Sequence, residues 1–149
     1  TYHCLVHGQP VWETLHVTIP LLPDGDAKHR TTANKKIGKP SVTDFRVVGN
    51  CGQFSWIEAK PKTGRTHQIR VHLSAHGFPV LCDPIYGRGA SRLGSVRNPE
   101  LLDFLKTHDG QMLHAEVLEF AHPITGEHMR FKTRLPDDML ELKCILEDM

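Results

Sequence analysis

One segment of the sequence concentrates side chains that can bind anions or move protons. Residues 60–87, KPKTGRTHQIRVHLSAHGFPVLCDPIYG, contain four Lys or Arg and three His, and no acid lies between Glu58 and Asp83. Guanidinium and ammonium groups at this density bind carboxylate or phosphate oxygens, and an arginine can do so through two parallel hydrogen bonds. The segment therefore predicts a site for anionic oxygens, either phosphates or a buried carboxylate.

A helix over residues 66–76 is expected to position this site. Ile69 and Leu73 follow a helical spacing, Gly77 stands where a helix C-cap belongs, and Thr66 is a candidate N-cap. The period-2 alternation of the preceding residues ends here, which indicates a change from strand to helix.

The first turn of such a helix would present backbone N–H groups together with Arg65 and His67, and Arg70 would project over the same turn. This arrangement favours a bound phosphate or carboxylate. The structural alternative is an arginine that forms a salt bridge across the core while the histidines bind backbone groups.

Other chemistries lack their sequence patterns. His72 and His76 have the i, i+4 spacing of zinc hydrolases, but no acid follows the first His and no third ligand is evident, so no metal is predicted. The glycines of residues 87–94 lack the Gly-Lys-Ser/Thr ending of a phosphate-binding loop, and no Gly-x-Ser-x-Gly is present.

Bulk properties place the chain among ordinary globular proteins. It has 149 residues and a net charge of +1, but residues 1–97 carry 13 Lys or Arg against 6 acids and residues 98–149 carry 5 against 11. An anionic partner such as a nucleic acid would be attracted to the first part, unless the two parts simply pair with each other. The four cysteines form no Cys-x-x-Cys pair, which favours reduced, cytoplasmic thiols. No apolar run could span a membrane, and no signal peptide is visible.

The remaining pattern predicts an α+β fold, with a mostly antiparallel mixed sheet and flanking helices. A long basic loop is expected over 23–40 and a polar loop over 88–98. The other expected elements are strands over 1–10, 13–22, 41–49, 52–61, 111–123 and 126–136, and helices over 99–108 and 137–149.

Residues 60–87 resemble the signature of RluA-type pseudouridine synthases. Those enzymes show a Thr-Gly-Arg-Thr-His-Gln-Ile-Arg-Val-His run, then Gly-x-Pro, then an Asp followed shortly by Tyr-Gly. Three flanking segments resemble the family in the family's order: YHCLVHG, GKPSVTDFRVV and LHAEVLEFAHPITGEHMRF. The similarity covers nearly the whole chain.

The resemblance implies isomerisation of uridine to pseudouridine in ribosomal or transfer RNA, with no cofactor and no metal. In that family a catalytic Asp attacks a nucleotide that has been flipped out of its stack. Tyr2 would stack on the flipped base and assist proton removal, Arg70 would pair with the catalytic carboxylate, and Leu113 would form an apolar wall of the base pocket. The residues expected to contact RNA are Lys35, Lys36, Lys39, Lys60, Lys62, Arg65, His67 and Gln68.

One departure from the family pattern is serious. The family's nucleophile lies in a His-Arg-Leu-Asp segment upstream of the Tyr strand, and this sequence has no such segment. Asp24, Asp26, Asp44 and Asp83 stand at other positions of the pattern. We therefore expect residues 1–149 to be the C-terminal portion of a single catalytic domain without a second domain, inactive alone and monomeric when complete. The alternative is a non-catalytic RNA-binding relative of the same fold.

Overall fold

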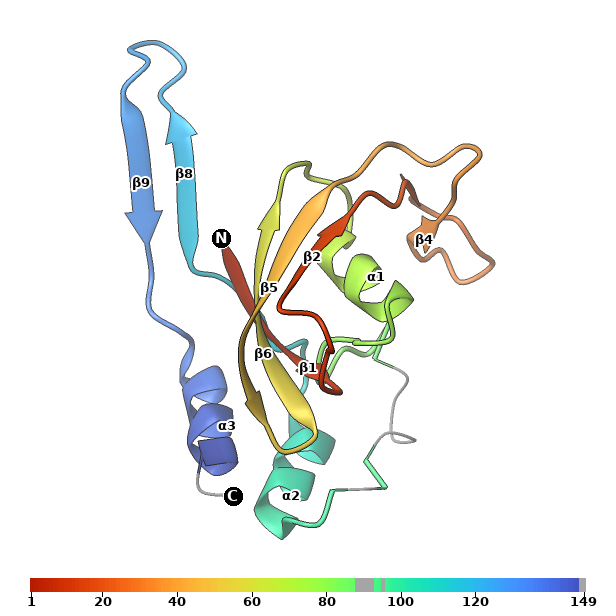
Figure 1. Cartoon of the computed structure of the whole chain (residues 1–149), viewed down its shortest axis with the longest axis vertical. Helices are drawn as coiled ribbons and strands as arrows, with labels where there is room; N and C mark the ends of the chain where they lie inside the picture. The colour runs from red at the N-terminus through yellow and green to blue at the C-terminus, as the bar shows by residue number, and fades with distance from the viewer. Residues whose placement is uncertain (88–92, 95, 148–149) are drawn as a thin grey trace.

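A five-stranded sheet forms the centre of the protein (Figure 1). The computed structural model describes residues 1–87, 93–94 and 96–147. The strand order is β2-β5-β6-β1-β7, and each pairing is antiparallel. The strands are β1 (Tyr2–His7), β2 (Thr14–Val17), β5 (Thr43–Cys51), β6 (Phe54–Pro61) and β7 (Leu113–Ala115). The predicted α+β class is confirmed.

The alternating sequences of β1, β5 and β6 explain why these strands pair. Successive side chains point to opposite faces, so that every second residue is available for a core. Gly52 takes a positive φ of 54° in the turn between β5 and β6, a backbone conformation that glycine adopts without strain. A bulge between Val47 and Gly49 interrupts the register of this pair.

Three helices cover the sheet. Helix α1 (Gln68–Ala75) lies on one side of it, and α3 (Asp137–Glu147) lies on the other (Figure 1). Helix α2 (Pro99–Thr107) contacts α3, and its N-cap Asn98 accepts a hydrogen bond from the Leu101 N–H at 3.0 Å. One cluster of buried apolar side chains joins the sheet to all three helices.

Two predicted strands are each divided in the structure. Residues 13–22 form β2 and then the short β3 (Leu21–Leu22), because Pro20 lacks the N–H that would continue the ladder. Strand β3 pairs with β4 (Thr32–Ala33), so the expected loop over 23–40 contains one strand of a small second sheet. Residues 111–123 are divided between β7 and β8 (Val117–Ala121).

Strands β8 and β9 (His128–Lys132) form a separate hairpin that projects from the body, as Figure 1 shows. The N-terminal amine of Thr1 donates to the Val117 carbonyl at 2.6 Å, which ties β1 to the base of this hairpin. The polar loop predicted over 88–98 lies largely outside the described residues. Among the described residues, no helix has the length and apolar character needed to cross a lipid bilayer.

Candidate functional site

The buried amide of Gln68 holds the segment that precedes α1 in place through hydrogen bonds. Its Oε1 accepts hydrogen bonds from the Arg65 N–H at 3.0 Å and from Thr63 Oγ1 at 2.7 Å. Its Nε2 donates to the Val42 carbonyl and to Thr43 Oγ1, both at 2.9 Å. Gln68 is only 4% exposed, so its amide holds this segment on β5 and is not available for direct contact with RNA.

Helix α1 begins two residues later than the sequence indicates. Its N-cap is His67, not Thr66, and the His67 backbone has a φ of 54° in the left-handed region. A non-glycine residue takes this conformation only where its surroundings hold it there. The C-terminal prediction is confirmed, because Gly77 follows the helix with a φ of 89°.

Arg70 is bound inside the protein by Asp83. Its Nε donates to Asp83 Oδ2 and its Nη2 donates to Oδ1, each at 2.7 Å. The side chain of Asp83 is fully buried and that of Arg70 is 8% exposed. Burial alone would raise the pKa of the Asp83 carboxyl, but hydrogen bonds from Arg70 and from the backbone of Tyr86 and Ile85 outweigh it and hold the pKa below its ordinary value. The Asp83 carboxylate is therefore charged.

Tyr86 completes this cluster. Its ring lies 5.0 Å from the Arg70 guanidinium carbon, within the range of a cation–π contact. Its backbone N–H donates to Asp83 Oδ1 at 3.0 Å, and its hydroxyl lies 3.0 Å from His67 Nδ1. The Asp-Pro-x-Tyr-Gly turn thus supplies both a carboxylate and an aromatic ring to Arg70.

The sheet register places Tyr2 and Leu113 on the face that α1 covers. Tyr2 pairs with Ala59, which pairs with Phe45 of β5, and Leu113 pairs with Cys4. Thr43 lies on the same face, because it is two residues from Phe45. Thr43 Oγ1 contacts His72 of α1 at 3.0 Å. Both Tyr2 and Leu113 are half-buried. No hydrogen bond, ion pair or ring contact within the described ranges joins Tyr2 to Arg70.

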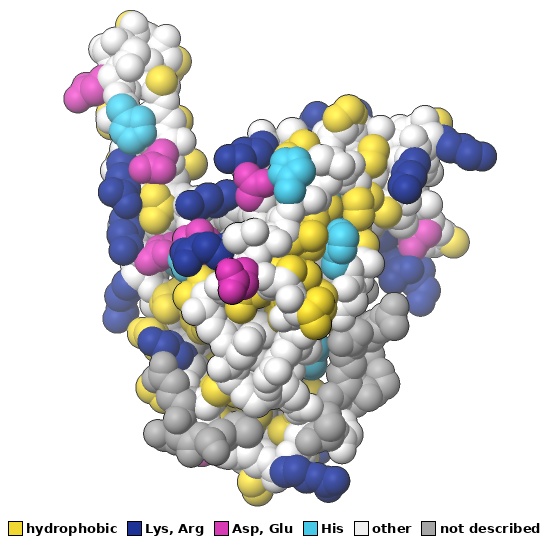
Figure 2. Space-filling model, in the orientation of Figure 1, with side chains coloured by type: hydrophobic (Ala, Val, Ile, Leu, Met, Phe, Trp, Pro, Cys, Tyr) yellow, Lys and Arg dark blue, Asp and Glu magenta, His cyan; other side chains and the backbone are white. Residues whose placement is uncertain are grey.

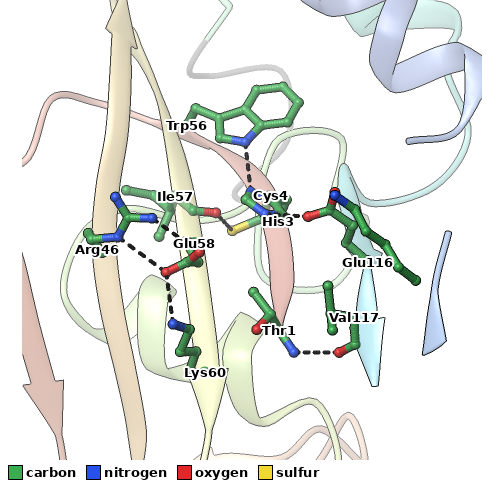
Figure 3. Close-up of polar contacts among 11 residues, drawn as sticks. Thr1, His3, Cys4, Arg46, Trp56, Ile57, Glu58, Lys60, Glu116 and Val117 are labelled. Atoms are coloured by element: carbon green, nitrogen blue, oxygen red, sulfur yellow. Dashed lines mark hydrogen bonds and ion pairs between the residues drawn. The ribbon is translucent and has the colours of Figure 1, made fainter. Parts of the chain in front are cut away.

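Lys60 and Lys62 are paired with acids. Lys60 Nζ lies 3.4 Å from Glu58, which also binds Arg46, and Figure 3 shows these three side chains together. Lys62 Nζ lies 3.4 Å from Asp44. Asp44, Arg46, Glu58 and Lys60 alternate with the residues of the α1-covered face, so this group belongs to the opposite face of the sheet.

The other four predicted cations are exposed and form no ion pair with any described residue. Lys35, Lys36 and Lys39 belong to the loop over 23–40, and the Arg65 Nε donates to the Pro40 carbonyl at 3.1 Å. One turn of this loop is fixed by Asn34, whose Oδ1 accepts from the N–H groups of residues 36 and 37. Figure 2 shows Lys and Arg side chains along the side of the molecule where this loop lies in Figure 1.

His72 fits the structural alternative, in which a histidine binds a backbone group instead of forming part of an anion site. This residue is fully buried, and its Nε2 lies 3.0 Å from the Ile19 carbonyl. Burial lowers the pKa of His72, so the ring is neutral at pH 7 and donates to that carbonyl. Within the described residues, no three His, Cys, Asp or Glu side chains gather as metal ligands would.

Sequence reasoning missed two members of the site. From the sequence alone, Asp83 receives no role beyond its place in the family pattern, and Tyr86 receives no role. The partnership of Asp83 with Arg70 spans 13 residues and has no periodic signal. The available signal was the position of both residues in one motif with Arg70.

Comparison with known proteins identifies the family. The protein-family model for RNA pseudouridylate synthase matches residues 1–75. A ribosomal large subunit pseudouridine synthase D of Vibrio vulnificus is 44% identical over 77% of this chain and 35% of its own length. An uncharacterised RNA pseudouridine synthase of Bacillus subtilis is 38% identical over 95% of this chain and 42% of its own length.

Solved structures agree in fold. The human RNA pseudouridylate synthase domain containing 1 superposes with a TM-score of 0.70 at 25% identity, over 99% of this chain and 65% of that one. The human RNA pseudouridylate synthase domain containing 4 superposes with a TM-score of 0.73 at 22% identity, over 98% of this chain and 61% of that one. This chain spans less than half the length of the two curated relatives. From the match over its first 75 residues and these relatives, the chain belongs to the RNA pseudouridylate synthase family.

Proposed function

We propose that this chain supplies the RNA-facing part of a pseudouridine synthase, which isomerises a flipped-out uridine in structured RNA by covalent catalysis. The observation that carries the proposal is the family match, together with the position of Tyr2 and Leu113 on the sheet face that is covered by α1, the helix of Arg70. The Vibrio relative is named for the large ribosomal subunit, which favours ribosomal over transfer RNA. The reaction requires no cofactor and no metal.

Arg70 is suited to hold a catalytic carboxylate. Asp83 binds its Nε and Nη2, so the guanidinium is fixed in one orientation, and Nη1 takes no part in that pair. A fixed guanidinium keeps a neighbouring carboxylate ionised, as a nucleophile requires. Tyr2 would stack on the base and Leu113 would supply an apolar contact.

The nucleophile has no counterpart among these residues. The sequence lacks the His-Arg-Leu-Asp segment in which the family carries its nucleophile, and the side chain of Asp83, although it binds Arg70, is fully buried. The other three aspartates considered above contact other basic side chains: Asp44 contacts His16 and Lys62, Asp26 contacts Arg30, and Asp24 contacts His29. We therefore propose that the 149 residues do not catalyse isomerisation alone. The same observation supports the second candidate, a non-catalytic RNA-binding relative of this fold.

The exposed cations without acid partners are the strongest candidates for RNA contact. Lys35, Lys36, Lys39 and Arg65 can bind phosphates without first breaking an ion pair. Lys60 and Lys62 would contribute less, and His67 would act through Tyr86, whose hydroxyl also binds the loop at Thr31. We further propose a cytoplasmic, monomeric protein; its four free cysteines support the reducing compartment.

The chain alone tests this proposal with two measurements. Its binding to a synthetic RNA hairpin with uridine in the loop should weaken steeply as salt rises, because phosphate contacts release counterions. The same RNA labelled with tritium at uracil C5 should release no tritium. Tritium release by the chain alone would contradict the absence of a nucleophile, and failure to bind RNA at any salt concentration would contradict the RNA partner.

A further inference from the structure

The loop over residues 23–40 is tied to the start of α1 by the hydroxyl of Tyr86. This hydroxyl accepts a hydrogen bond from the backbone N–H of Thr31 at 3.1 Å and lies 3.0 Å from His67 Nδ1. The ring of Tyr86 is 9% exposed and packs with Leu21 and Val71. One side chain thus contacts the middle of the loop and the N-cap of the helix.

The Tyr86 hydroxyl takes part in both hydrogen bonds at once. It accepts from the Thr31 N–H, and its contact with His67 Nδ1 has the ring as acceptor or donor according to the tautomer. Burial, and then the charge of Arg70, lower the pKa of His67, so its ring is neutral at pH 7. Thr31 is 3% exposed, and without Tyr86 its N–H would be a buried donor with no acceptor at this position.

The loop cations follow directly after this attachment. Strand β4 begins at Thr32, the Asn34 turn comes next, and the three lysines lie within the following five residues. At the far end of the loop, Lys39 exchanges two backbone hydrogen bonds with Leu21, at 2.8 and 2.9 Å, and Pro40 accepts from Arg65. The lysines are therefore held between two fixed points, which reduces the conformational entropy that binding would cost.

We propose that Tyr86 is a positioning residue for RNA. Its hydroxyl holds loop 23–40 against α1, so that Lys35, Lys36 and Lys39 form with Arg65 a preorganised surface for the phosphate backbone. The inference rests on the proposed RNA-binding function and adds to it the residue that orders the contact surface.

Three variants of the chain test the inference against the RNA hairpin. Tyr86→Phe keeps the ring over Arg70 and removes only the hydroxyl. The triple variant Lys35→Gln, Lys36→Gln, Lys39→Gln removes the three lysine charges of the proposed contact surface and leaves Lys28 and Arg30 of the loop in place. Ser55→Ala is the matched control, because it also removes a buried hydroxyl. That hydroxyl donates to the Gly8 carbonyl near the start of β6, whereas α1 follows the end of that strand.

The hydroxyl should matter only while the loop lysines are present. Tyr86→Phe is expected to weaken RNA binding about tenfold at physiological salt and to reduce the salt-dependence slope by about 2, since each phosphate contact contributes about 0.7 to 0.9. In the triple-variant background it should have no further effect. Ser55→Ala should bind RNA as the unmodified chain does.

The outcomes separate the inference from the function on which it rests. If the triple variant binds RNA normally, the proposed RNA-binding role of the loop is wrong. If the triple variant loses affinity but Tyr86→Phe does not, or if Tyr86→Phe weakens the triple variant by the same factor, the positioning role is wrong. Hydrogen exchange of the unmodified chain is an independent check. The Thr31 amide should be protected like the amides of α1, and exchange as fast as that of an exposed loop would overturn the inference.

Discussion

At the scale of single residues, the Arg70–Asp83 ion pair is the feature on which the site depends. A buried pair with two short hydrogen bonds fixes the guanidinium, but it also leaves an uncompensated charge if either partner is lost. The pair therefore links the stability of the fold to the geometry of the proposed site.

Removal of the Asp83 carboxylate should destabilise the fold strongly. Asp83→Ala leaves Arg70 buried without its partner, and we expect a loss of about 3–5 kcal/mol in the free energy of unfolding, measured by urea denaturation. Asp44→Ala is the matched control, because Asp44 belongs to exposed ion pairs and should change stability by less than about 1 kcal/mol. Equal effects of the two substitutions would contradict the structural role of Asp83.

The same carboxylate should give the protein a defined sensitivity to acid. The pKa of Asp83 is lower in the folded than in the unfolded chain, so the folded state favours the ionised form. Its contribution to stability is complete above the unfolded pKa of about 3.9 and is lost as the pH falls below that value. The difference in unfolding free energy between the unmodified chain and Asp83→Asn should therefore be constant near neutral pH and shrink below about pH 4. A difference that grows as the pH falls would refute this account.

At the scale of elements, the turn over residues 83–87 builds the site. It places the Asp83 carboxylate in hydrogen-bonding contact with the Arg70 guanidinium and the Tyr86 ring in cation–π contact with the same group. A hydrogen bond of 3.0 Å from the Gly87 N–H to the Asp83 carbonyl closes the turn. A side chain at position 87 would collide with that carbonyl oxygen, so this turn requires glycine.

Substitution of Gly87 should therefore disturb the turn. Gly87→Ala forces the Asp83 backbone to move and should reduce the free energy of unfolding by about 1–3 kcal/mol. Gly64→Ala is the control, because a Cβ there meets no atom within 4 Å. Thermal unfolding followed by circular dichroism compares the two, and the prediction fails if both variants melt at the temperature of the unmodified chain.

The elements also show how far sequence patterns reach. The alternating residues of β1, β5 and β6 predicted their strands, because the period of two follows directly from the pleat. The sequence predicts the start of α1 two residues too early. The contacts that surround His67, from Tyr86 to its side chain and from Gln68 to Val42, join residues far apart in the sequence, and a local pattern does not contain them. The sequence predicts that Arg70 binds a carboxylate, but its partner in this chain, Asp83, is a tertiary contact that no periodic pattern encodes and that only their shared motif indicates.

At the scale of the whole molecule, the charges divide into paired and unpaired groups. The face of the sheet that bears Lys60 and Lys62 carries its own acids, whereas Lys28, Lys35, Lys36 and Lys39 of the loop over 23–40 have no acid partner among the described residues. Among the described residues, the loop and Arg65 thus form one group of exposed cations without acid partners, which is where the proposed RNA contact is expected.

This division predicts unequal effects of charge removal. The triple lysine variant of the loop should reduce the salt-dependence slope of RNA binding by about 2 to 3, because up to three phosphate contacts are lost. The double variant Lys60→Gln, Lys62→Gln should reduce it by less than about 1, and Lys106→Gln on α2 should leave it unchanged. Equal slopes for the triple and double variants would show that the acid pairs do not decide which cations bind RNA.

The central claim is that Arg70 serves the nucleophile of a pseudouridine synthase, and a chimera tests it directly. The portion of the Bacillus subtilis relative that lies upstream of its region of similarity to this chain, where the family pattern places the catalytic Asp, is joined to this chain. Tritium release from RNA labelled at uracil C5 is then measured for the chimera, for its Arg70→Lys variant and for its Arg65→Lys control, with folding checked by circular dichroism. We predict release by the chimera and by the control, and its loss in a folded Arg70→Lys variant; full activity of that variant would contradict the account.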